Sequence, residues 1–226
     1  PRLIKQTSST PILVSDINKK GSSSIKKFQP FRNHLYFHHN GLCRIDRTGN
    51  LEENLGTINP TGSHQEYSLM FSINDKLIFF SSTSSGFGVE PCVWDGVQSV
   101  NLKDIRIGAG SGGLIPFQKG SPTSSSQGSF VNPMPEVINN VIVFIGDDGA
   151  SRTLWRTDGT ASGTFKINDT NFSLGHVYQL LKFNNHIYFK TTDGGTWSTD
   201  GTTAWPINQE IPSLNFCYYA IVKDSI

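Results

Sequence analysis

The 226 residues carry 19 Lys and Arg against 18 Asp and Glu, a formal net charge of +1, and no run of basic residues longer than two. The balanced charge excludes the clustered basic stripe of a nucleic-acid surface. No apolar run approaches the ~20 residues of a membrane-spanning helix, so we expect neither nucleic acid nor membrane insertion. Charged residues make up 16%, aromatic residues 11%, and Gly numbers 22, which favours strands and tight turns. An all-β protein is predicted.

A polar turn followed by an aromatic-rich apolar stretch recurs along the chain, at 31–37, 72–80, 138–144 and 183–189. Each occurrence predicts a hairpin turn entering a strand. If Leu35, Leu77, Ile142 and Ile187 are equivalent, the spacings are 42, 65 and 45 residues. The long spacing contains a Gly, Ser and Pro-rich insertion at about 108–135, predicted to be a loop. Without it, the period fits a four-stranded propeller blade.

A second element recurs in step with the first, a tryptophan strand that ends in Asp-Gly. Asp-Gly is a strong hairpin signal because glycine reaches the positive φ that tight turns require. We interpret the tryptophans as one repeat position that packs between neighbouring units. The residues assigned to this structural repeat are Trp94, Asp95, Gly96, Trp155, Asp158, Gly159, Trp197, Asp200 and Gly201.

The stretch 154–164, Leu-Trp-Arg-Thr-Asp-Gly-Thr-Ala-Ser-Gly-Thr, resembles the Glu-Leu-Trp-x-Thr-Asp-Gly-Thr-x-x-Gly-Thr repeat of many secreted or surface-associated bacterial proteins. Stretch 14–18 with 21–24 resembles the downstream half of that unit. Thr153 stands where the family usually has Glu, and 43–49 replaces the Trp and Asp-Gly pattern in the first unit. The resemblance implies a β-propeller and an extracellular or cell-surface location, but no particular activity.

The repeats predict a single domain over 1–226, a propeller of five four-stranded blades. The expected blades are 12–48, 53–96, 98–159, 163–201, and 203–226 completed by 1–8. The last blade joins both termini, which closes the ring and leaves no open sheet edge. On this prediction Arg2–Thr7 shares a sheet with Phe216–Val222. The alternative is a fragment of a longer propeller.

No residue set forms a metal or cofactor signature, and none is expected. Cys43, Cys92 and Cys217 lie far apart without a Cys-x-x-Cys pair. They are interpreted as buried strand residues, with one disulfide and one free thiol as the other arrangement.

The candidate ligand contacts are few. Asp147, Asp148 and Asp193 fall in equivalent predicted loops. A central pair of acids would suit a glycoside hydrolase, but acids that recur in successive units are more economically explained as turn-formers. His38 and His39 are adjacent, and neighbouring strand residues point apart, so a shared metal is not expected. Trp205 lies outside the tryptophan repeat.

From these features we predict a non-catalytic recognition module, lectin-like, that binds carbohydrate through polar loops on one face of the ring. Repeated weak sites would gain by avidity on a multivalent glycan. Two alternatives stay open: a scaffold that binds another protein through the 108–135 insertion, and a glycoside hydrolase or lyase with acids at the central channel.

Overall fold

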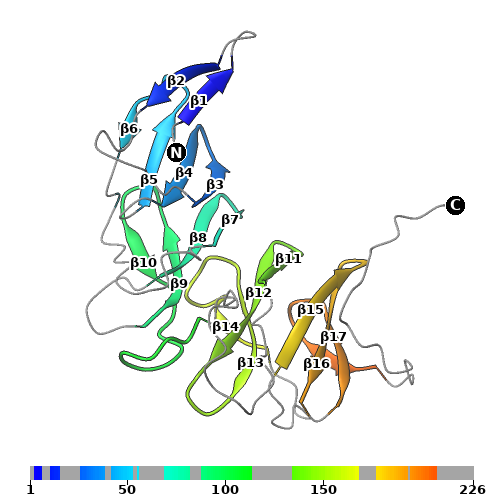
Figure 1. Ribbon diagram of the computed structural model, residues 1–226. Helices are drawn as coiled ribbons and strands as arrows, with labels where there is room; N and C mark the ends of the chain where they lie inside the picture. The colour runs from blue at the N-terminus through cyan, green and yellow to red at the C-terminus, as the bar shows by residue number, and fades with distance from the viewer. Residues whose placement is uncertain are drawn as a thin grey trace, which may run out of the picture.

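The computed structural model describes residues 3–6, 11–15, 26–38, 42–52, 55, 69–81, 88–113, 134–167, 177–192 and 194–207. Within these ranges the chain forms four four-stranded antiparallel sheets, one two-stranded sheet and no helix (Figure 1). The predicted all-β class is confirmed.

Each four-stranded sheet is a meander of consecutive strands. We name the sheets I to IV in chain order, preceded by the pair β1 (Leu3–Gln6) and β2 (Pro11–Ser15). Their strands are, for sheet I, β3 (Lys26–Phe31), β4 (His34–His38), β5 (Leu42–Asp46) and β6 (Leu51–Glu52); for sheet II, β7 (Met70–Ile73), β8 (Lys76–Ser81), β9 (Glu90–Trp94) and β10 (Ser99–Asn101); for sheet III, β11 (Glu136–Ile138), β12 (Val141–Asp147), β13 (Arg152–Thr157) and β14 (Phe165–Lys166); and for sheet IV, β15 (Val177–Phe183), β16 (His186–Thr191), β17 (Thr196–Thr199) and β18 (Ala204–Pro206).

The sheets follow one another along an open arc (Figure 1). Sheet I contacts sheet II through β3 and β7, and sheet III contacts sheet IV chiefly through β11 and β15. The first strand of each sheet therefore lies on the inner side of the arc, and the short fourth strand lies on the outer side.

The hydrogen bonds group the strands differently from the repeat units expected from the sequence. Units 12–48, 98–159, 163–201 and 203–226 each open with a strand that pairs with the strand before it, namely β2, β10, β14 and β18. A turn of only a few residues folds each of these strands back onto its predecessor. The sheets therefore end one strand later than those units imply.

In sheets II, III and IV, the turn between the first and second strands has two left-handed residues. Asn74 and Asp75 have φ of 47° and 54°, and Asn184 and Asn185 have φ of 45° and 60°. Positive φ at both central residues is the mark of type I′ hairpins, whose twist matches that of the flanking strands. Asn and Asp tolerate this conformation better than other side chains do, which explains the recurring polar turn in the sequence.

Alternation along the strands gives sheets II and III two apolar faces. In β8, Leu77 and Phe79 pack against sheet I, while Ile78 and Phe80 pack against sheet III. We call the face toward the preceding sheet the rear face and the face toward the next sheet the forward face. The buried seams between successive sheets hold most of the core, and their largest fully buried side chains include Tyr36, Phe79, Phe80, Phe144 and Phe189.

The seams leave no room beside the Asp-Gly turns of sheets III and IV. Gly201 has φ of +88°, and a Cβ there would lie 2.8 Å from Val141 Cγ2 of the preceding sheet. Gly194 has a matching φ of +89°, but a Cβ there would meet nothing within 4 Å.

Gly194→Ala should therefore lower the free energy of unfolding by about 1 kcal/mol through φ alone. Gly201→Ala should lower it by about 1 to 2 kcal/mol more through the clash. Urea denaturation measures both, and equal losses would contradict this packing.

Candidate functional site

All the predicted ligand contacts except Trp205 belong to one kind of loop, the connection between the second and third strands of a sheet. His38 ends β4, Asp147 ends β12, and Asp148 begins the β12–β13 loop. His39 and Asp193 fall in the corresponding loops of sheets I and IV but lie outside the described residues. Consecutive antiparallel strands bring these connections to the same edge of each sheet.

Asp147 and Asp148 are engaged in their own turn. Asp147 Oδ1 accepts a hydrogen bond from Gly149 N at 2.8 Å, and Asp148 Oδ1 accepts from Ala150 N at 2.9 Å and Ser151 N at 2.8 Å. Lys166 Nζ lies 3.3 Å from Asp148 Oδ2. Partial burial opposes the charged carboxylate, but the two N–H donors and Lys166 outweigh it, so the pKa of Asp148 is lowered. Both acids act as turn-formers.

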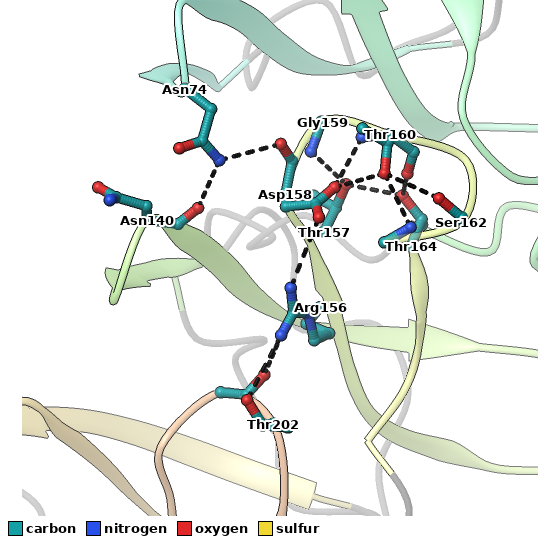
Figure 2. Close-up of polar contacts among 12 residues, drawn as sticks. Asn74, Asn140, Arg156, Thr157, Asp158, Gly159, Thr160, Ser162, Thr164 and Thr202 are labelled. Atoms are coloured by element: carbon teal, nitrogen blue, oxygen red, sulfur yellow. Dashed lines mark hydrogen bonds and ion pairs between the residues drawn. The ribbon is translucent and has the colours of Figure 1, made fainter.

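The Asp-Gly turns are built by the same kind of contact. Asp95 Oδ1 accepts from Val97 N at 2.7 Å, Asp158 Oδ1 from Thr160 N at 2.9 Å, and Asp200 Oδ1 from Thr202 N at 2.7 Å. In sheet III the turn is further braced by the 2.7 Å contact between the hydroxyls of Thr157 and Thr164 (Figure 2). These carboxylates replace backbone acceptors in Asx-turns.

The repeated tryptophans line the rear faces of their sheets. Trp155 pairs with Phe144, and Trp197 pairs with Phe189, at one repeat position. Trp94 lies two residues further along its strand, because Cys92 pairs with Phe79 and takes the tryptophan position in sheet II. Cys43 takes the same position in sheet I, opposite Phe37. Both cysteines are buried, and Cys217 lies outside the described residues.

Polar side chains join neighbouring sheets at the opposite edge. Asn74 Nδ2 donates to Asn140 O at 2.9 Å and to Asp158 O at 3.2 Å, from sheet II to sheet III (Figure 2). Asn139 Nδ2 donates to Asp200 O at 3.0 Å, from sheet III to sheet IV. At the equivalent point between sheets I and II, Arg32 forms an ion pair with Asp75 at 2.9 Å. We call these contacts the turn latches.

Arg156 adds a second connection between sheets III and IV. Its Nη1 donates to Gly201 O at 3.2 Å, and its guanidinium lies 4.9 Å from the Phe165 ring centroid. Figure 2 shows Arg156 pointing from sheet III toward Thr202 of sheet IV. The Asp-Gly turn of sheet IV is thus held from the preceding sheet by side chains as well as by the apolar seam.

Glu90 is a buried acid that the sequence interpretation passed over. It is fully buried, and burial raises the pKa of its carboxyl to about 7, against the opposing effect of three backbone N–H donors. The donors are Ile105, Arg106 and Gly112, from the loop that follows β10. A signal was available: Glu90 pairs with Ser81 as Thr153 pairs with Gly146, the position where the resembled repeat has Glu. The equivalence was missed because the repeat was aligned on Trp94, which lies four residues after Glu90 instead of two.

Trp205 lies on the forward face of β18 and is 38% exposed. Val100 and Phe165 occupy the same position in sheets II and III, across from Val93 and Arg156, and are 40% and 37% exposed. The fourth-strand position is therefore open even where a following sheet is present. His186 meets the Trp205 ring edge-on at a centroid distance of 5.7 Å, which leaves a held, accessible aromatic surface.

Metal-ion sites and membrane-spanning helices were looked for within the described ranges. Among these residues, no group of three or more His, Cys, Asp or Glu is arranged to hold a metal ion. The same part of the chain has no helix with the length and apolarity needed to cross a membrane.

Comparisons with known proteins place the chain in no family. No protein-family model and no curated protein sequence matches it. Among solved structures, the computationally designed Ika8 protein gives a TM-score of 0.41 at 12% identity over 81% of this chain, which spans 48% of that chain. The computationally designed Ika4 protein gives 0.39 at 15% identity, over 84% of this chain and 94% of its own. A chain from a study of two prolyl endopeptidases gives 0.34 at 10% identity, over 90% and 38%. These low similarities assign neither a fold nor an activity.

The turn role of Asp148 has a measurable acid signature. Because its pKa is below the ordinary 3.8, its charged form stabilises the fold above that pH, and this stabilisation is lost as the pH falls further. Asp148→Asn keeps an acceptor for the turn but loses the charge. We expect it to lower the free energy of unfolding at pH 7 by about 1 kcal/mol and to flatten the acid limb of the stability curve. An unchanged acid limb would show that the carboxylate is not held in this way.

Proposed function

We propose that the chain is a five-bladed β-propeller that serves as a non-catalytic recognition module at the cell surface or outside the cell. The architecture is supported by the unequal exposure of equivalent forward faces. Phe31, Ile73 and Ile138 end the first strands of sheets I to III and are 4%, 7% and 1% exposed beneath the next sheet. Phe183 ends the first strand of sheet IV and is 50% exposed. The forward face of sheet IV thus leaves an aromatic side chain open at the position that the next sheet covers in sheets I to III.

The rear face of sheet I supports the same proposal from the other end. Phe37, Cys43 and Ile45 form a cluster there with exposures of 0%, 0% and 5%, although no four-stranded sheet precedes them. In sheets II to IV the same positions pack against the preceding sheet. A fifth sheet that meets sheet IV with one face and sheet I with the other satisfies both ends of the arc.

The β1–β2 pair fits the third and fourth strands of that fifth sheet. Gln6 pairs with Pro11 around four intervening residues, as Trp94 pairs with Ser99 in sheet II and Thr199 pairs with Ala204 in sheet IV. The first two strands would come from the C-terminal residues. The expected pairing of Arg2–Thr7 with Phe216–Val222 lies largely outside the described residues and stays a prediction.

Ring closure is tested by the turn latch of sheet IV. Asn184 occupies the position of Asn74 with a matching φ of 45° against 47°, yet its amide has no hydrogen-bond partner within the described ranges. Gly keeps this backbone conformation and removes the amide. Asn74→Gly should lower the free energy of unfolding by about 1 kcal/mol, and in a closed ring Asn184→Gly should lower it equally. A neutral Asn184→Gly would count against the fifth sheet.

The recognition role rests on one observation, the repeated display of the loops between second and third strands along one edge of the successive sheets. In sheet III the Asx-turn bonds of Asp148 fix the loop backbone, and a loop held in its binding conformation loses less entropy on binding. Polar, pre-organised loops suit sugar hydroxyls. Trp205, beside His186 toward the opposite edge of sheet IV, supplies a separate exposed aromatic plane for a sugar ring. We infer a carbohydrate ligand bound at several weak, equivalent sites, with strength from avidity.

A glycan array tests the carbohydrate proposal. We expect binding to multivalent glycans that exceeds binding to the monovalent sugar by on the order of 100-fold. Trp205→Ala should weaken the multivalent binding about tenfold, because stacking of a sugar ring on an aromatic plane contributes on the order of 1 kcal/mol. Trp205→Phe should retain most of the binding. Circular dichroism checks that both variants fold. Absence of any glycan signal at high protein concentration would overturn the proposal.

A protein-binding scaffold is the second candidate, favoured by Ile107. This side chain is 91% exposed at the tip of the loop that Glu90 holds. An enzyme with acids at the central channel has less support, because Asp147 and Asp148 serve the turn at the end of a second strand and the inner strands are the first ones.

A further inference from the structure

The segment 102–113 leaves sheet II, forms a loop and returns beside sheet III. It is anchored by Glu90, which lies at the first position of β9. Ile105 N donates to Glu90 Oε2 at 3.1 Å, while Arg106 N and Gly112 N donate to Oε1 at 3.3 and 2.8 Å. One buried side chain thus holds both ends of the loop.

The loop is fitted closely to this carboxyl group. A Cβ on Gly112 would lie 2.6 Å from Glu90 Oε1 and 2.4 Å from Ile105 Cβ. Further bonds close the loop on the sheets, from Gly113 N to Val89 O at 2.8 Å and from Asp147 N to Gly112 O at 2.9 Å. The position of Gly112 therefore links Glu90 to Asp147 on the proposed recognition edge.

The charges around Glu90 do not balance it. Within the described ranges no Lys, Arg or His forms an ion pair with it, and the Arg106 guanidinium turns to Asp147 instead, at 3.6 Å. Asp104, on the loop itself, is close enough to raise the pKa of Glu90 further, and the Cys92 thiol on β9 is neutral, its pKa being raised to about 12 by burial. Ionisation of Glu90 would set a buried negative charge against the Asp104 carboxylate, so loop and sheet would repel.

We propose that the loop 104–113 is a proton-controlled switch, closed against the sheet while Glu90 is neutral and open when Glu90 ionises. Opening hydrates the carboxylate and separates it from Asp104, which removes the two costs of burying the charge. Because the pKa of Glu90 rises from an ordinary 4.5 to about 7 in the closed state, protons stabilise closure, and the closed state weakens as the pH rises through this interval. Opening also releases the Gly112 contact with Asp147, so the recognition edge would change with pH.

Amide hydrogen exchange measured by NMR tests this loop switch without any ligand, so its outcome is independent of the proposed carbohydrate binding. After correction for intrinsic exchange, protection of the Ile105, Arg106 and Gly112 amides should fall roughly tenfold or more between pH 5 and pH 8. The amides of Val143 and Leu154, within sheet III, should stay constant. The carboxyl carbon shift of Glu90 should titrate over the same range.

Glu90→Gln supplies the matched control, because its amide is close in shape to the neutral acid and cannot ionise. The three loop amides of this variant should stay protected throughout, with no pH dependence. Loop protection in the wild-type protein that stays constant, or that rises with pH, would overturn the proposal, since the N–H donors would then hold the charged form. A Glu90 that does not titrate between pH 5 and pH 8 would overturn it even if the variant failed to fold.

Discussion

The fold depends on the two-residue period of its strands. In sheets II and III the side chains on both faces are apolar and neither face tolerates water, so each of these sheets needs a neighbour on both sides. Ile78 and Phe79 show the consequence, since adjacent residues of β8 are completely buried against different sheets. Stability is therefore shared between neighbours, as in other repeat proteins where each unit contacts only the next. The forward face of sheet IV and the rear face of sheet I lie at the two ends of the arc, and we propose that a fifth sheet packs between them.

The polar contacts between sheets have a different role from the apolar seams. A buried aromatic pair such as Phe80 and Phe144, with centroids 4.9 Å apart, contributes mainly affinity between sheets. The turn latches are exposed, and each contributes little energy, but their geometry fixes the register of one sheet against the next. Because Asn74 and Asn139 reach the same kind of carbonyl in the following sheet, the seams between sheets II and III and between sheets III and IV repeat one alignment.

Local features of the sequence predicted the fold class well, and features that depend on distant partners were missed. Asn-rich turns and Asp-Gly turns are complete within a few residues, so the all-β class and the recurring hairpins could be recognised. Sheet membership depends on which strand β10 bonds to, and spacing alone assigned it to the following unit. Trp94 was placed by its residue type, although Cys92 occupies the aligned position. Glu90 could not be recognised as an anchor because its three partners lie 15 to 22 residues further along the chain.

The exchange of tryptophan for cysteine at one repeat position gives the seams unequal chemistry. Cys92 sits where sheets III and IV carry an indole ring, and its Sγ faces the carbonyls of Ser81 and Glu90 at 3.5 and 3.3 Å. Burial keeps this sulfur protonated and unreactive, so a thiol reagent can reach it only when sheets I and II part. The rate at which Cys92 is labelled therefore reports how often the seam between sheets I and II opens, whereas Cys43 reports on the rear face of sheet I.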